Sequence, residues 1–407
     1  MSTPNSLVEK TSARCCVAGG GPAGIMLAFL LARAGVGVLV LEKHKDFFRD
    51  FRGDTIHPST LELMHELGLL EDLLRLPHQE LRQIRAHFGD QVMTLADLSH
   101  LPTRCQFVAF LPQWDFLNFL TEHARRYPQF QLRMEAEVTD LIFDGERVAG
   151  VRARTPQGEL EVRASLVVGA DGRASTVRQR GHLEVIDLGA PIDVLWFRLS
   201  KQDADPAQSF GHVGAGQFMV LLDRGDYWQC AYVIQKGIFD EKREKGLEAF
   251  RAEVTRCAPF LGNRVHEIKD WNDVRLLTVK VDHLRQWYRE GLLCIGDSAH
   301  AMSPVGGVGI NLAIQDAVAT ANLLAGKLRD DRVTNDDLQA VQNRRERAAR
   351  LTQRLQIFIH EHFLKAIFES TTRIDPPWPL RLANRISLLR RLPARMIGIG
   401  FQPEHIQ

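Results

Sequence analysis

Three glycines near the N-terminus have the spacing of a phosphate-binding turn. Gly19, Gly21 and Gly24 form the pattern G-x-G-x-x-G between an apolar run, Cys15–Ala18, and an apolar segment, Ile25–Arg33. The first glycine permits a tight turn, the second lets a pyrophosphate approach the backbone, and the third lets a helix pack closely on a strand. Free N–H groups at the start of that helix then point at the phosphates. The pattern therefore predicts a strand, a turn and a helix that bind a dinucleotide.

An acidic residue follows where such a site requires one. Glu42 ends a second apolar run, Val36–Leu41, and a carboxylate at that point can accept both ribose hydroxyls of an adenosine. The stretch Cys15–Leu41 carries one charge, Arg33, and therefore resembles a membrane span or a signal peptide in hydropathy. The glycines and Pro22 interrupt its apolar core, and this favours a strand–turn–helix–strand unit instead.

Two further apolar runs end in a glycine and an aspartate. Leu166–Val168 is followed by Gly169-Ala170-Asp171-Gly172, and Leu292–Ile295 is followed by Gly296-Asp297. The carboxyl ends of parallel strands meet at one edge of a sheet, where ligands bind. An Asp-Gly pair alone is usually only a turn, so the prediction depends on both runs being strands of the same sheet as the first turn.

A loop rich in glycine follows the third turn. Pro304–Gly309 leads into a long apolar segment, Ile310–Leu328, which has the composition of a buried helix. The N–H groups at the start of such a helix can stabilise an anion.

The elements between these turns are expected to form a second sheet and several helices. A helix capped by Ser59 or Thr60 is expected to end at Gly68, and another is expected to begin at Gln113. Alternating apolar and polar residues over Leu81–Leu111 and Asp193–Gln235 predict antiparallel strands. The second of these stretches is rich in aromatic residues and is expected to cover a pocket for a planar ring, through Trp196, Phe197, Phe218, Tyr227, Trp228 and Tyr232.

Composition excludes several classes of protein. The chain has 407 residues and a net charge of +1, which gives no sign of nucleic-acid binding. Its 6 cysteines have neither C-x-x-C nor disulfide-framework spacing. We therefore expect reduced thiols, a cytoplasmic location and no metal site, with Met1–Ser12 as a frayed tail.

The three glycine motifs, in this order and spacing, resemble those of the group A FAD-dependent aromatic hydroxylases, the p-hydroxybenzoate hydroxylase type of flavoprotein monooxygenase. The resemblance runs from about Ala13 to Leu328. It implies an α/β fold: a Rossmann-like FAD-binding domain with a parallel sheet and helices, an antiparallel-sheet substrate domain and a C-terminal helical segment. The implied boundaries are 13–80, 111–183 and 275–330 for the FAD-binding domain, 81–110 and 184–274 for the substrate domain, and 331–407 for the C-terminal segment.

The same resemblance assigns roles to individual residues. Glu42 holds the adenosine ribose, Asp171 lies near the pyrophosphate and the path of the nicotinamide donor, and Asp297 binds a ribityl hydroxyl. Pro304 and Gly307 belong to the loop beside the flavin and its oxygen site and are the two candidate catalytic positions. The full implied set of cofactor-binding residues is Gly19, Gly21, Ala23, Gly24, Glu42, Lys43, Arg52, Gln113, Asp171, Gly296, Asp297, Pro304, Gly307, Gly309, Ile310 and Asn311.

The implied activity is hydroxylation of a phenolic or heteroaromatic small molecule. Non-covalent FAD, reduced by NADH or NADPH as a transient co-substrate, would react with O₂ to give a C4a-hydroperoxide that attacks the ring. The chain lacks the W-x-W-x-I-P signature of flavin-dependent halogenases, and no residue stands out as a catalytic base among His57, His212 and Tyr232. The alternatives are an epoxidase or hydroxylase of a lipid or quinone, and a non-catalytic FAD-fold binding protein.

The C-terminal stretch Arg381–Arg395 alternates arginines with apolar residues and prolines. It could lie on a membrane, but its prolines break a long amphipathic helix, and we expect it to pack over the substrate domain. The protein is expected to be a monomer or homodimer that binds no nucleic acid and no membrane.

Overall fold

The sheet that carries the N-terminal glycine turn has eight strands, and its centre is parallel. The computed structural model describes residues 8–48, 54–206, 208–372 and 375–407. Neighbouring strands follow the order β19-β20-β11-β1-β2-β8, and β10 and β9 extend the sheet antiparallel from β11. The strands are β1 (Glu9–Ala18), β2 (Val38–Leu41), β8 (Phe130–Arg133), β9 (Glu137–Asp144), β10 (Arg147–Thr155), β11 (Gly158–Gly169), β19 (Tyr288–Arg289) and β20 (Leu292–Cys294).

A second sheet of seven strands is mostly antiparallel. Its order is β17-β13-β16-β15-β14-β5-β6, with β14 and β5 parallel. The strands are β5 (Gln83–Phe88), β6 (Gln91–Asp97), β13 (Ile192–Ser200), β14 (Phe210–Gly214), β15 (Gln217–Asp223), β16 (Tyr227–Gln235) and β17 (Arg275–Thr278). Two small sheets connect the parts: β3 (Thr55–Ile56), β7 (Val108–Phe110) and β4 (Gln79–Leu81), and β12 (Val185–Asp187) with β18 (Asp282–Leu284).

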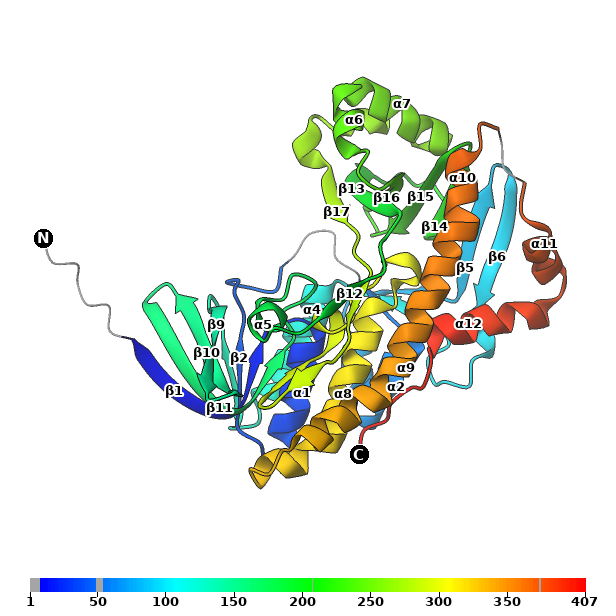
Figure 1. Cartoon of the computed structure of the whole chain (residues 1–407). Helices are drawn as coiled ribbons and strands as arrows, with labels where there is room; N and C mark the ends of the chain where they lie inside the picture. Colours follow the sequence, from blue (N-terminus) through cyan, green and yellow to red (C-terminus); the bar gives the residue numbers. More distant parts are fainter. Residues whose placement is uncertain (1–7, 49–53, 207, 373–374) are drawn as a thin grey trace, which may run out of the picture.

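Helices cover both sheets (Figure 1). Those around the first sheet are α1 (Pro22–Arg33), α2 (Pro58–Glu66), α3 (Leu70–Leu74), α4 (Gln113–Ala124), α5 (Thr176–Arg180), α8 (Gly309–Arg329) and α9 (Asn335–Ile359). Helices α6 (Phe239–Glu244) and α7 (Leu247–Cys257) lie on the second sheet, and α10 (Lys365–Glu369), α11 (Trp378–Arg385) and α12 (Arg391–Gly398) follow α9.

Helices α1 and α8 are both strongly apolar, but both lie in the interior of the protein. Every residue of α1 from Ala23 to Ala32 is buried against the parallel sheet. The segment Val305–Arg329 is long and apolar enough to cross a membrane, yet 67% of its apolar stretch is buried inside the protein. Burial of this kind is what the core helix of a globular domain shows.

The structure corrects several expectations about individual elements. The first strand begins at Glu9, not Cys15, because its N-terminal half pairs with β11. Helix α2 is preceded by His57 as its N-cap and starts with Pro58, so neither Ser59 nor Thr60 caps it. The segment Arg275–Thr278, assigned above to the FAD-binding domain, pairs with β13 in the seven-stranded sheet.

Candidate functional site

The glycine turns that are far apart in the sequence end neighbouring strands. β20, β11, β1 and β2 lie side by side and parallel, and Gly169 pairs with both Ala18 and Cys294. The residues that follow these strands therefore meet at one carboxyl edge of the sheet, as the sequence predicted. In open α/β sheets this edge is where ligands bind.

The first turn has no room for side chains where it touches the second turn. Gly19 has φ +104°, and a Cβ there would lie 2.4 Å from the carbonyl oxygen of Ala170. A Cβ at Gly24 would lie 2.0 Å from the carbonyl oxygen of Gly19. At Gly21 a Cβ would meet nothing closer than that same Ala170 oxygen at 4.0 Å. The open side of the turn at Gly21 is thus compatible with a bound pyrophosphate.

Helix α1 begins without a side-chain cap. Its N-cap is Gly21, Pro22 is its first residue, and its first turn contains no acidic side chain. The N–H groups of the first turn need partners from outside the helix, and an anion at a helix N-terminus supplies them. This arrangement fits the pyrophosphate of FAD.

Glu42 is fixed at the end of β2 by the same turn. The N–H of Gly20 donates to its Oε2 at 2.8 Å, and the N–H of His44 donates to its Oε1 at 3.0 Å. These two hydrogen bonds hold the buried carboxylate at the end of β2, at the same sheet edge as the first turn. Lys43, beside it, is exposed to solvent.

Asp171 accepts hydrogen bonds from the start of α5. Its carboxylate accepts the hydroxyl of Ser175 and the N–H of Val177, the second at 3.1 Å. Burial raises its pKa, and these hydrogen bonds act in the opposite direction. The side chain therefore connects the Ala170–Gly172 turn to the start of α5, at the same sheet edge as the other motifs.

The third turn is held by a buried aspartate, Asp316, that no sequence motif marked. Gly296 has φ +60°, and its N–H donates to Asp316 Oδ2 of α8 at 3.0 Å. A Cβ at Gly296 would lie 3.3 Å from the Cβ of Ala23, which connects this turn to α1. Asp297 lies on the outer side of the turn with its side chain 32% exposed, 3.7 Å from an Arg173 nitrogen. Its carboxylate is accessible to a ligand at the sheet edge.

The Pro304–Gly309 loop is packed against β3. Thr55 Oγ1 donates to the carbonyl oxygen of Gly307 at 2.8 Å, and Asn311 Nδ2 donates to the carbonyl oxygen of Thr55 at 3.0 Å. Gly307 has φ +64°, and a Cβ there would lie 2.6 Å from Thr55 Oγ1. Helix α8 starts at Gly309 without a side-chain cap, so Gly309 and Ile310 present uncapped backbone, whereas the Asn311 side chain holds the loop.

Helix α9 supports this loop from the other side. Gln356 Nε2 donates to the carbonyl oxygens of Ser303 and Val305, both at 2.9 Å. The Ser303 hydroxyl and His360 Nε2 are 2.9 Å apart. Gln356 and His360 thus contact the residues on either side of Pro304, although they are more than fifty positions away along the chain. No sequence motif pointed to them.

A buried ion pair joins the loop before β3 to the second sheet. Asp54 is 5% exposed and pairs with Arg224, from the turn between β15 and β16. The N–H of Gln113, at the start of α4, donates to Asp54 Oδ1 at 3.2 Å. Burial raises the pKa of Asp54 to about 6, against the opposing effect of Arg224. The sequence predicted a site residue at Gln113, whereas no sequence motif marked Arg224. Arg52 lies outside the described residues.

The aromatic residues that were expected to cover one pocket lie on two opposite faces of the second sheet. Alternation along the strands turns Phe197, Trp228 and Tyr232 toward α7, where they pack with Phe250 in a separate core. The Tyr232 hydroxyl donates to Glu253 at 3.2 Å. Those three residues therefore face away from the Pro304–Gly309 loop. Trp196 and Phe218 lie on the opposite face, in a cluster that includes Val305 of that loop. Its other members on the strands of the second sheet are Ala86, Phe88, Met93, Leu95, Ile192, Val194, Val213, Val220, Leu222, Ala231, Val233 and Leu277.

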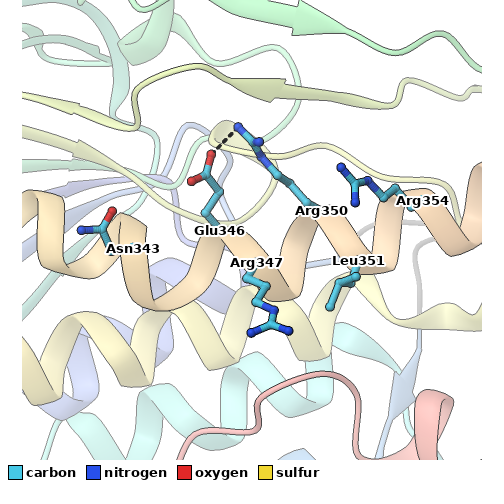
Figure 2. Close-up of a pocket in the computed structure, with 6 residues that line it drawn as sticks. All are labelled: Asn343, Glu346, Arg347, Arg350, Leu351 and Arg354. Carbon is cyan, nitrogen blue, oxygen red and sulfur yellow. Dashed lines mark ion pairs between the residues drawn. The ribbon is translucent and has the colours of Figure 1, made fainter.

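A shallow hollow on the outside of α9 is not part of this site. Figure 2 shows that its lining comes from the exposed side of one helix, with an ion pair between Glu346 and Arg350. The remaining residues are Asn343, Arg347, Leu351 and Arg354. None of them belongs to the turns at the sheet edge.

His57 predicts a pH dependence of stability. It is 1% exposed, and its backbone N–H donates to Asn311 Oδ1. Its ring Nδ1 donates to the carbonyl oxygen of Ile397 at 2.7 Å. Burial lowers its pKa from 6.5 to about 4. As pH falls below 6.5 the unfolded chain takes up a proton that the folded chain resists, so stability decreases toward pH 4. We expect a loss of about 2 kcal/mol between pH 7.5 and 5 from this residue.

The test is urea unfolding at both pH values for wild type, His57→Gln and the exposed control His266→Gln. The glutamine keeps an N–H for Ile397 and does not titrate, so the pH-dependent loss should shrink for His57→Gln alone. Identical pH dependence in all three proteins would contradict the assignment.

Asp297 predicts an effect on cofactor affinity. Asp297→Ala removes an accessible carboxylate from the third turn, and loss of a hydrogen bond to a charged group costs about 1.5–3 kcal/mol. We expect FAD to bind about ten- to a hundredfold more weakly, measured by fluorescence titration of the apoprotein. The exposed Asp203→Ala is the matched control; equal affinity of the two variants would show that Asp297 does not contact the cofactor.

Comparison with known proteins gives consistent matches. A protein-family profile described as an FAD binding domain matches residues 12–355. The chain is 33% identical to 6-methylpretetramide 4-monooxygenase of Streptomyces rimosus, over 84% of this chain and 82% of that protein. It is 24% identical to para-nitrophenol 4-monooxygenase of Pseudomonas sp. strain WBC-3, over 77% and 78%. It is 30% identical to dialkyldecalin synthase of Streptomyces rugosporus, of which it spans 63%.

Solved structures agree on the fold. p-Nitrophenol 4-monooxygenase PnpA from Pseudomonas putida superposes with a TM-score of 0.77 at 22% identity, covering 95% of this chain and 97% of that one. The myxobacterial chondrochloren halogenase CndH gives 0.75 at 20% identity, covering 96% and 93%. The α/β architecture with two sheets and C-terminal helices is therefore that of FAD-dependent monooxygenases and their fold relatives.

Proposed function

Because this chain belongs to the family of FAD-dependent flavoprotein monooxygenases, we propose that it uses NAD(P)H and O₂ to hydroxylate a phenolic or other electron-rich aromatic small molecule. One observation carries the proposal: the three glycine turns and Glu42 converge on one sheet edge, while the loop after the third turn contributes Val305 to the apolar face of the second sheet. A cofactor held at that edge would thus have its reactive end near the apolar face of the second sheet that includes Val305. The proposed location is the cytoplasm, where NAD(P)H is supplied.

We assign the binding of FAD to three parts of the site. The turn Gly19–Gly24 and the start of α1 hold the pyrophosphate, Glu42 holds the adenosine ribose, and Asp297 holds the ribityl chain. When bound, FAD supplies the redox chemistry: it accepts a hydride from NAD(P)H and transfers one oxygen atom of O₂ to the substrate.

The protein itself contributes position and environment. Uncapped N–H groups at Gly309 and Ile310 favour negative charge at the start of α8. The packing of Thr55 on Gly307 fixes the loop that presents them. The apolar side chains around Val305 exclude water from the reacting ring. Pro304 and Gly307 are the residues that we propose to border the oxygen site.

We propose a fused-ring phenol as the substrate class. The relative with 33% identity is named for a monooxygenation of 6-methylpretetramide. The apolar face that includes Trp196 and Phe218 suits a planar ring system. The chain is proposed to act as a monomer or homodimer.

The test begins with the purified protein, which should be yellow and should release FAD on heating. A panel of mono- and polycyclic phenols is then screened for stimulation of NADH and NADPH oxidation, and products are analysed by mass spectrometry under ¹⁸O₂. We expect one labelled oxygen in the product of at least one compound, and faster flavin reduction when that compound is bound.

Other outcomes would assign the protein differently. Label from water, or hydrogen peroxide as the sole product with every compound, would contradict hydroxylation. A requirement for halide would indicate a halogenase, and colourless protein that cannot be reconstituted would indicate a non-catalytic relative. Turnover of lipid or quinone substrates alone would favour the related epoxidases and hydroxylases.

A further inference from the structure

The C-terminal segment has two apolar faces, and the protein covers one of them. Helices α11 and α12 lie along the outer side of β6, at the edge of the seven-stranded sheet (Figure 1). Leu380 packs with the apolar face of that sheet. Ala394, Ile397 and Ile399 pack with Leu98 and Leu101. This inner face accounts for the attachment of the segment to the molecule.

Three specific contacts fix the segment in place. Asn384 Oδ1 accepts the N–H of Thr94 at 3.4 Å, and the carbonyl oxygen of Ile397 accepts Nδ1 of His57. A Cβ at Gly398 would lie 2.5 Å from a methyl group of Leu101, so the backbone is in close contact there. The C-terminal segment is therefore firmly attached to the rest of the protein and forms part of its surface.

The outer face presents large apolar side chains to solvent. Within the described residues, six of the fourteen exposed large hydrophobic side chains fall between Trp378 and Leu392. Their exposed fractions are Trp378 75%, Leu392 65%, Leu388 63%, Ile386 45%, Leu389 43% and Leu382 42%. A concentration of this kind marks an interaction surface, whereas single exposed apolar residues are ordinary.

The same stretch is strongly basic. From Pro376 to Pro403 the sequence has five arginines and no acidic residue. Arg381 lies 3.6 Å from Asp375. Arg385, Arg391 and Arg395 are exposed, and they form no ion pair with any other residue that the structure describes. The apolar side chains are thus interspersed with uncompensated positive charge.

We propose that this outer face of α11, α12 and the turn between them is a docking surface for a bilayer that contains anionic lipid. Exposed tryptophan and leucine beside arginine is the composition of a helix that lies in the membrane interface. With eight residues each, α11 and α12 are too short to span a bilayer, so the association is peripheral. A symmetric contact with a second copy would place like charges together, and this disfavours self-association through the same face. The proposal extends beyond the hydroxylase function and does not depend on it.

The experiment is flotation of the FAD-loaded protein with phosphatidylcholine vesicles that contain 0 or about 30% phosphatidylglycerol. Two double variants test the two components of the surface: Leu388→Ser with Leu392→Ser, and Arg391→Gln with Arg395→Gln. Their matched controls are Leu276→Ser, which is 40% exposed on β17, and Arg347→Gln with Arg354→Gln, exposed on α9 (Figure 2). Retention of FAD and of the thermal unfolding midpoint shows that each variant is folded.

We expect binding to the anionic vesicles, weaker binding at 0.5 M NaCl, and little binding to neutral vesicles. Each arginine near an anionic surface contributes about fivefold in affinity, so the arginine double variant should bind about 25-fold more weakly. The leucine variant should also lose binding, whereas both controls should resemble wild type. Absence of binding by wild type, equal losses in the controls, or a concentration-dependent dimer that the leucine variant abolishes would overturn the proposal.

Discussion

Gly24→Ala is expected to remove FAD binding and to destabilise the protein. An added Cβ would lie 2.0 Å from the carbonyl oxygen of Gly19, so the turn or α1 must move. Such overpacking typically costs about 1–3 kcal/mol of stability. The displaced N–H groups would lose two or more charge-assisted hydrogen bonds of about 1.5–3 kcal/mol each, which weakens FAD at least about a hundredfold. Fluorescence titration with FAD and urea unfolding of the apoprotein measure the two effects separately.

Gly37→Ala is the matched control from the same strand–helix–strand unit. A Cβ at Gly37 meets no atom within 4 Å, so its effect on stability should stay within about 0.5 kcal/mol and FAD should bind normally. If Gly24→Ala binds FAD as tightly as Gly37→Ala does, the first turn is not the pyrophosphate site.

Arg345→Met is expected to cost about 3–5 kcal/mol of stability, the range for removing one partner of a buried ion pair. Arg345 and Asp316 have fully buried side chains, and Arg345 Nε donates to Asp316 Oδ1 at 3.0 Å. The other oxygen of Asp316 accepts the N–H of Gly296 and lies 2.6 Å from Nε2 of His300. Burial acts to raise the pKa of Asp316, but His300 and Arg345 together hold it below its ordinary value.

The variant should therefore also loosen the turn that presents Asp297, and FAD affinity should fall although Arg345 does not lie at the sheet edge. The control is Arg350→Met, on the exposed side of the same helix (Figure 2), where loss of the ion pair with Glu346 should cost less than about 1 kcal/mol. Equal stability of the two variants in urea unfolding would contradict the role assigned to the buried network.

The sequence by itself determined the features that depend on neighbouring residues. The first turn required glycine at Gly19 and Gly24 because the backbone there has no space for a Cβ, and that requirement is visible in residue type and spacing alone. The strands before Gly169 and Gly296 were likewise visible in the sequence, as short apolar runs that end in glycine. Parallel pairing of these strands followed from the rules of α/β sheets, so the meeting of the three turns at one sheet edge was predictable before any contact was known.

Only the tertiary structure decided how distant segments complete the site. Alternation predicted that β13, β15 and β16 have two faces, but which face meets α7 and which meets Val305 depends on packing, and Phe197, Trp228 and Tyr232 were placed on the wrong side. The pair Asp54–Arg224 joins residues 170 positions apart, and no local pattern connects them.

The C-terminal segment shows the same division. Its arginines and apolar residues were evident from composition, and the sequence offered packing and membrane contact as alternatives. In the structure Leu380 lies on the inner face and Trp378 on the outer face. Periodicity shows which apolar side chains share one face of a helix or strand. Whether that face is buried depends on the element that packs against it, and this neighbour is fixed only when the whole chain has folded.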